Sequence, residues 1–203
     1  MRRLLLGFAF AALAAAPVWA RAAEPEFKVT PVAEKVVERL PEGPLFWRVE
    51  TYADLPAAKA AAGPLSLAVD VDGKGVLFTL GPKGGASAGA TKLAEIGPVP
   101  PIQAKRHLLR INRAGGPPGA KTPVHTHPGS EAFYVLKGQL TQKTSHGAAK
   151  LGAGAAMNGH APGMVMQLES TGSEPLDQLV MFDVDADQPF SSPAAFEDPA
   201  SRR

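Results

Sequence analysis

The stretch of sequence that decides the fold spans residues 119–138 and reads GAKTPVHTHPGSEAFYVLKG. It contains two histidines two positions apart, His125 and His127, and the carboxylate Glu131, which follows the turn-forming pair Pro128-Gly129. Side chains two positions apart on a β-strand point to the same face, so a strand here presents both imidazoles together. The turn can return the Glu131 carboxylate to that face.

The donor atoms of this stretch suit a metal ion. Two neutral imidazoles and one carboxylate form the facial set that holds Fe(II) and similar divalent ions with coordination positions left open. Because this set is harder than a thiolate site, Fe, Mn, Ni, Zn and Cu are all candidates. An isolated His-x-His pair would be weak evidence, since such pairs often arise by chance or have structural roles. Here the whole run fits the spacing G-x5-H-x-H-x3-E-x6-G without a departure.

With this spacing, the chain resembles the cupin superfamily, whose first sequence motif has the same pattern. The match covers residues 119–138 directly, and the spacing of strand candidates extends it over roughly 102–184. The resemblance implies an all-β fold, a cupin-like antiparallel β-barrel of the jelly-roll type with its ligands inside. It also implies that His125, His127 and Glu131 bind a metal, and that Gly119 and Gly138 shape turns.

The second motif of the family departs from its usual form in this chain. Gly154 stands where that motif should begin, but Pro162 and Gly163 are adjacent instead of separated by one residue. Counted back from Ser170-Thr171-Gly172, where the family has Asn-Thr-Gly, the histidine position holds Met166. The usual fourth ligand is therefore missing or replaced.

Three interpretations of the fourth position stay open. His125, His127 and Glu131 could bind the metal alone, with Met166 lining the cavity, in keeping with the frequent use of methionine as a packing residue. The Met166 thioether could be a soft ligand, which would favour copper. In the third interpretation, His160 reaches the metal from the turn before Pro162.

The composition agrees with an all-β fold. Of 203 residues, 21 are Gly, 20 are Pro and 45% are hydrophobic. The Gly and Pro share is below that of a disordered chain and favours short strands joined by tight turns. The absence of Cys excludes disulfides, zinc–thiolate sites and cysteine nucleophiles. A net charge of +2 gives no reason to expect a nucleic-acid partner.

The N-terminus has the pattern of an export signal. A basic start, Arg2-Arg3, precedes an apolar run over 4–16 that is too short for a membrane-spanning helix. Small or apolar residues favour cleavage near Ala20 or Ala22. The alternative, a buried N-terminal helix, would lack a polar face. We expect a mature protein without a membrane span, exported to the periplasm or the extracellular space.

Residue types predict the elements of the mature chain. Residues 45–52 are rich in aromatic and β-branched side chains and predict a strand, whereas 30–40 fits a helix or a strand. Residues 54–62 have the cap, first turn and end of a short helix, and Asp72-Gly73 predicts a hairpin. Further strands are expected at 107–112, 132–136, 139–144, 165–169 and 178–184.

These elements give a plan with one barrel. We expect a signal peptide at 1–22, an N-terminal extension at 23–100 with strands that pack on the barrel, the cupin barrel at 101–187 and an irregular tail at 188–203. Both faces of the strand at 132–136 are apolar. One face should fill the barrel and the other should contact a second sheet or a partner, which suggests a homodimer.

Two functions from different classes follow. The first is an exported cupin that binds a divalent metal in its barrel and acts on a small molecule, with dioxygenase- or isomerase-like chemistry. The second is a non-catalytic periplasmic protein that binds a metal or a small ligand. The fold alone does not choose between enzyme and binding protein, because function resides in the site.

Overall fold

The structure, a computed structural model, describes residues 23–197. The expected signal peptide and the last six residues of the expected tail, 198–203, lie outside the described residues. The described chain consists of antiparallel strands in three sheets and one short helix, which confirms the predicted all-β class. No helix in this part of the chain has the length and apolar character needed to cross a membrane.

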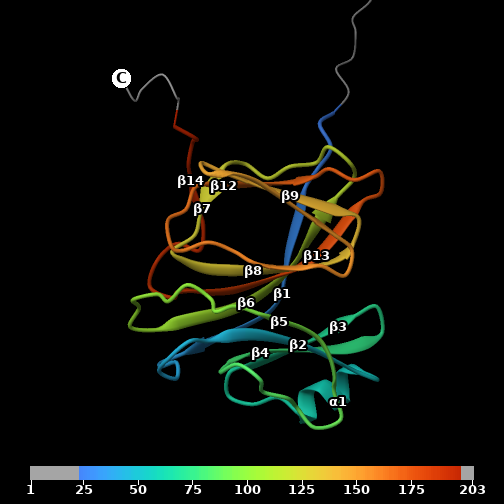
Figure 1. Cartoon of the computed structure of the whole chain (residues 1–203), viewed down its shortest axis with the longest axis vertical. Helices are drawn as coiled ribbons and strands as arrows, with labels where there is room; N and C mark the ends of the chain where they lie inside the picture. The colour runs from blue at the N-terminus through green and yellow to red at the C-terminus, as the bar shows by residue number, and fades with distance from the viewer. Residues whose placement is uncertain (1–22, 198–203) are drawn as a thin grey trace, which may run out of the picture.

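Two five-stranded sheets face each other and form the barrel (Figure 1). The first has the order β1-β6-β13-β8-β11, with β1 (Lys28–Val37), β6 (His107–Gly116), β13 (Leu176–Asp185), β8 (Gly129–Lys137) and β11 (Ala156–Asn158). The second has the order β10-β9-β12-β7-β14, with β10 (Gly147–Gly152), β9 (Gln139–Thr144), β12 (Met166–Ser170), β7 (His125–Thr126) and β14 (Ser192–Pro193). Apolar side chains from both sheets, including Phe133 and Leu168, form the barrel core.

A third sheet of four strands covers the outer face of the first and lies below the barrel in Figure 1. Its order is β3-β4-β2-β5, with β3 (Ser66–Val71), β4 (Lys74–Gly81), β2 (Phe46–Tyr52) and β5 (Thr91–Ile96). Trp47 and Phe78 of this sheet belong to the same apolar core as Leu109 and Met181 of the barrel. One core therefore joins the third sheet to the barrel.

This packing accounts for the two apolar faces of β8. Phe133 and Val135 belong to the barrel core, while Ala132 and Leu136 pack in the core shared with the third sheet. The outer face is thus covered by the same chain, and the apolar pattern that suggested a homodimer needs no second copy.

Local signals position several elements as predicted. The helix α1 (Leu55–Ala60) begins at Asp54, whose Oδ1 accepts a hydrogen bond from the Ala57 N–H at 2.8 Å. Asp72 and Gly73 have φ values of 53° and 86°, as a tight hairpin turn between β3 and β4 requires. The ambiguous segment 30–40 lies mainly in β1, because it pairs with β6 along the first sheet.

The tail differs from the prediction of an irregular segment. Ser192 and Pro193 form β14 and pair with Thr126 and His125 of β7. The tail therefore adds a short strand beside the first histidine of the motif.

Candidate functional site

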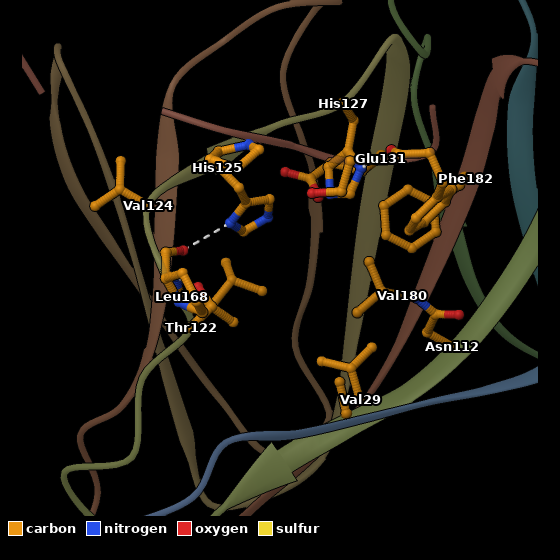
Figure 2. A pocket seen from close by; sticks show the side chains of 15 residues that line it. Val29, Asn112, Thr122, Val124, His125, His127, Glu131, Leu168, Val180 and Phe182 are labelled. Atoms are coloured by element: carbon orange, nitrogen blue, oxygen red, sulfur yellow. Dashed lines mark hydrogen bonds between the residues drawn. The ribbon is translucent and has the colours of Figure 1, made fainter. Parts of the chain in front are cut away.

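The three donors of the first motif line one cavity of about 420 Å³ inside the barrel. Figure 2 shows His125, His127 and Glu131 at one end of this cavity and Val29 and Val180 towards the other. Most of the remaining wall is apolar and includes Ala114, Pro123, Val124, Leu168, Phe182, Phe190 and Pro193. The site therefore combines a polar end with a hydrocarbon-lined interior.

The strands around the motif bring the donors to the cavity. His125 lies on β7, which pairs with β12 through Met166 and with β14 on its other side. Glu131 lies on β8, opposite Phe182 of β13. Close approach of these two strands requires Gly129, because a Cβ there would lie 2.2 Å from the Asp183 carbonyl oxygen.

Each imidazole has one nitrogen held by a backbone carbonyl. Nδ1 of His127 lies 2.6 Å from the Phe190 oxygen, and Nδ1 of His125 lies 2.8 Å from the Pro123 oxygen. Donation by Nδ1–H selects the tautomer whose Nε2 has a free lone pair, which is the form that binds metals. Burial lowers the pKa of His127 to about 4, so this ring is neutral at pH 7.

Aromatic rings surround His127. Its ring centroid lies 4.9 Å from those of His125 and Phe182 and 4.8 Å from that of Phe190. The Arg110 guanidinium lies over the Phe190 ring, and its central carbon is 4.2 Å from the ring centroid. These contacts hold the imidazole in one orientation by packing as well as by its hydrogen bond.

Glu131 is a buried carboxyl group with an amide as its partner. Its exposed fraction is 1%, and Gln142 Nε2 donates a hydrogen bond to Oε1 at 2.9 Å. Burial raises the pKa of Glu131 to about 8, although the hydrogen bond from Gln142 acts in the opposite direction. A carboxyl group in such surroundings either keeps its proton or gains a nearby positive charge.

The two candidates for the fourth position lie in different places. Met166 is 2% exposed, and its sulfur lies 3.8 Å from Gln142 Nε2, the same atom that bonds Glu131. His160 is half-buried near His146 and does not line the cavity. Neither residue is among those that line the cavity. Met166 and Glu131 share Gln142 as a neighbour, and the N–H of Gly159, next to His160 in the chain, donates a hydrogen bond to the Glu131 carbonyl oxygen at 2.8 Å.

The types of donor atom suit a divalent ion, although these atoms are not arranged around one common position. Within residues 23–197, no group of three or more His, Asp or Glu side chains is arranged to hold a metal ion. Two Nε2 lone pairs and a buried carboxyl group nevertheless share one cavity, beside a Gln142 Oε1 that is buried without a hydrogen-bond partner. These residues fit a metal by their chemistry and by the wall they share.

Sequence reasoning did not single out Gln142 or Phe190. Gln142 lies among polar neighbours on β9, where no apolar alternation marks the inward face. Phe190 belongs to the tail predicted to be irregular, where a lone aromatic residue was the only available signal. Both contacts depend on the packing of segments that are far apart in the chain.

Comparisons with known proteins match this description of the barrel. Residues 115–182 match the family model of the cupin domain. No curated protein matches the chain.

Three of the solved structures that match are similar over less than half of the chain. The polyketide cyclase RemF from Streptomyces resistomycificus is 16% identical with a TM-score of 0.37, over 44% of this chain and 63% of that one. The DMSP lyase DddQ from Ruegeria pomeroyi DSS-3 is 24% identical with a TM-score of 0.38, over 44% and 45%. A conserved protein with a double-stranded β-helix domain from Klebsiella pneumoniae is 21% identical with a TM-score of 0.37, over 43% and 75%. The chain spans less than two thirds of the first two, and these likenesses say nothing about activity.

Proposed function

Since the chain carries a cupin domain over residues 115–182, we propose that it is a metal-binding cupin that acts on a small, largely apolar molecule inside its barrel. His125, His127 and Glu131 would hold the ion. The observation that carries the proposal is that these three side chains share one apolar cavity, in which Glu131 is buried with only an amide as its hydrogen-bond partner.

A bound divalent ion would supply a Lewis acid with open coordination positions. The chain's own residues prepare the site for it. The carbonyl groups of Phe190 and Pro123 keep each Nε2 lone pair available. A neutral His127 needs no deprotonation at pH 7, and Gln142 orients the Glu131 carboxyl group.

The cavity indicates the class of molecule that would enter. A volume of about 420 Å³ lies in the range of roughly 300–1,000 Å³ that is usual for small-molecule sites. Its hydrocarbon wall would bind the apolar part of the molecule and exclude water, while the imidazole end would receive its polar group.

The second candidate function is binding without catalysis. It is favoured by Met166, which stands where the resemblance implies a histidine ligand. A site with three donors holds a metal or small ligand less firmly than one with four, and such a site suits a carrier or sensor. Turnover of small molecules by the metal-loaded protein would exclude this alternative.

Export is part of the proposal and rests on the N-terminal pattern alone. Cleavage near Ala20 or Ala22 would leave a mature chain that begins at Arg21 or Ala23. N-terminal sequencing of the protein recovered from the periplasm or medium of its source tests this. Recovery of an intact Met1 terminus from the cytoplasm would contradict it. A homodimer is not proposed, because the third sheet covers the face that suggested one.

Elemental analysis tests the metal site. The purified protein is incubated separately with Fe²⁺, Mn²⁺, Ni²⁺, Zn²⁺ and Cu²⁺, desalted and analysed beside variants. We expect close to one ion per chain, lost in His127→Ala and retained in His146→Ala, a control at an exposed turn. Absence of a stoichiometric ion in all five cases would overturn the proposal.

Variants at Met166 decide the fourth position. Met166→His restores the histidine that the resemblance implies and should tighten metal binding by about tenfold or more, which corresponds to ~1.4 kcal/mol. Met166→Leu keeps the volume and removes the sulfur. If Met166 only packs, Met166→Leu binds the same metal with the same affinity. A selective loss of copper in Met166→Leu would instead make the thioether a ligand.

A further inference from the structure

A second cavity, of about 360 Å³, lies outside the barrel. Its walls come from the segment between β1 and β2, residues 40–45, and from the segment before β6, residues 99–103. His107 and Asp183 line it from the first sheet. Both side chains lie on the strand faces directed towards the third sheet. His107 is two positions from Leu109 and Asp183 is two positions from Met181, and side chains two positions apart on a strand share a face; Leu109 and Met181 belong to the core shared with the third sheet.

His107 and Asp183 form a buried pair. His107 Nδ1 lies 2.9 Å from Asp183 Oδ1, and their side chains are 10% and 4% exposed. With Nδ1–H donated to the carboxylate, Nε2 carries the lone pair. Within residues 23–197, no hydrogen bond engages this Nε2. In this tautomer the pair offers a hydrogen-bond acceptor to a cavity that it shares with none of the three motif residues His125, His127 and Glu131.

The wall around this pair carries acidic side chains and, in the described chain, no basic one besides the histidine; Gln103 adds a neutral amide. Pro41, Pro100 and Pro101 line it and have no backbone N–H. Glu42 and Asp183 add two carboxyl groups, and the described lining residues include neither Lys nor Arg. A positively charged donor matches this wall, whereas an anion would approach two carboxylates without a compensating charge.

Hydrocarbon surface completes the cavity. Leu40, Val99 and Ile102 line it beside the polar pair. A ligand with a short alkyl chain and one charged head could place its chain against these residues and its head at His107.

We propose that this cavity is a second ligand site that binds a small organic cation, an alkylammonium whose N–H groups donate to His107 Nε2 and to the carboxylates. The site would work independently of the barrel, whose cavity has different walls. Its function would be recognition of a small amine, separate from any reaction at the first motif.

Calorimetric titration with three matched probes tests the chemistry. The probes are n-butylammonium chloride, n-butanol and sodium butyrate, which share an alkyl chain and differ in the charge of the head. Titration at pH 8 keeps the amine protonated, since alkylamines ionise near pH 10. Burial raises the pKa of Asp183 above its ordinary value, although its hydrogen bond with His107 acts in the opposite direction, so an alkaline buffer is chosen to promote ionisation of this carboxyl group.

We expect one butylammonium ion per chain, bound at least about tenfold more tightly than butanol, a difference of ~1.4 kcal/mol, and no binding of butyrate. His107→Gln should weaken butylammonium binding by tenfold or more. Glu42→Gln, at an exposed position that does not disturb packing, should weaken it by about threefold, in keeping with the small value of exposed charge pairs.

A barrel variant and a spectroscopic signal locate the ligand. Glu131→Gln should leave butylammonium binding unchanged, because Glu131 lines the other cavity. If His107→Gln fails to fold, a shift of the His107 ¹⁵Nε2 resonance on addition of butylammonium to the unaltered protein carries the same test. Equal binding of the three probes, absence of butylammonium binding, or its loss in Glu131→Gln would overturn the proposal.

Discussion

The side chains of the first motif owe their chemistry to residues that are remote in sequence. The Phe190 carbonyl sets the tautomer of His127, and Gln142 is the hydrogen-bond partner of Glu131. Motif spacing predicts which atoms can donate to a metal. It does not predict that burial lowers the pKa of His127 to about 4 and raises that of Glu131 to about 8.

The raised pKa of Glu131 predicts that the metal-free protein loses stability as pH rises from about 4.5 to about 8. The carboxyl group ionises near 4.5 when unfolded and near 8 when folded, so the folded state holds the proton more tightly. This contribution is fully present below pH 4.5 and is lost as pH rises through 8. Between pH 7 and 8, this group should lower the free energy of unfolding by up to about 1.4 kcal/mol per pH unit.

Urea unfolding in the presence of a chelator measures this effect. Glu131→Gln has no proton to release, so its stability should change less over the same pH interval. His127 adds little there, because its lowered pKa leaves the ring neutral in the folded state and an ordinary imidazole is mostly neutral above pH 7. The same pH dependence in the parent and in Glu131→Gln would exclude Glu131 as the cause.

At the scale of elements, the first and last residues of the motif are both glycines but have different surroundings. Gly119 and Gly138 have φ values of +86° and +76°, a conformation that disfavours other residues. A Cβ at Gly119 would lie 3.7 Å from the nearest side-chain atom, Pro25 Cγ. A Cβ at Gly138 would lie 2.6 Å from the carbonyl oxygen of Pro175, the residue directly before β13.

This difference predicts unequal costs for the same substitution. Gly119→Ala should cost about 1–2 kcal/mol, the penalty of the left-handed conformation alone. Gly138→Ala adds a backbone clash that the β8–β9 turn cannot relieve without moving, so its cost should exceed 3 kcal/mol. Midpoints of urea unfolding for the two variants check this ordering. Similar costs would mean that the turn at Gly138 relaxes freely.

Strand prediction succeeded where side chains alternate and failed where partners impose the strand. β6, β8, β9, β12 and β13 overlap predicted strands. β10 reads GAAKLG, whose small residues carry no alternation, yet it pairs with β9 along its whole length. β5, β11 and β14 also escaped prediction. Two to six residues of weak propensity become strands there because a neighbouring strand satisfies their backbone groups.

At the scale of the whole molecule, the third sheet and the barrel share one apolar core. Trp47 of β2 and Ile111 of β6 are both fully buried in it. Because neither layer keeps its buried surface without the other, loss of one should expose the core of the other. The described chain should therefore unfold as a single unit.

Coincident unfolding curves would demonstrate this. In the chain that begins at residue 23, Trp47 is the sole tryptophan and its fluorescence reports on the third sheet. Circular dichroism reports on all strands together. Ile111→Ala, in the barrel, should lower the free energy of unfolding by about 2–5 kcal/mol, by the same amount from both curves. Leu93→Ala, at a 40% exposed position, should change the value from either curve by no more than ~0.5 kcal/mol. Separate transitions for the two probes would show independent domains.

The sequence by itself determined the all-β class, the hairpin at Asp72-Gly73 and the spacing that makes His125, His127 and Glu131 candidate ligands. These features depend on residue type, alternation and turn chemistry, which act over a few residues. Only the tertiary structure decided that Met166 and Glu131 share Gln142 as a neighbour, that neither Met166 nor His160 lines the cavity and that the outer face of β8 is covered by the chain's own third sheet. Each of these outcomes depends on contacts between distant segments, and local patterns carry no information about which distant segments meet.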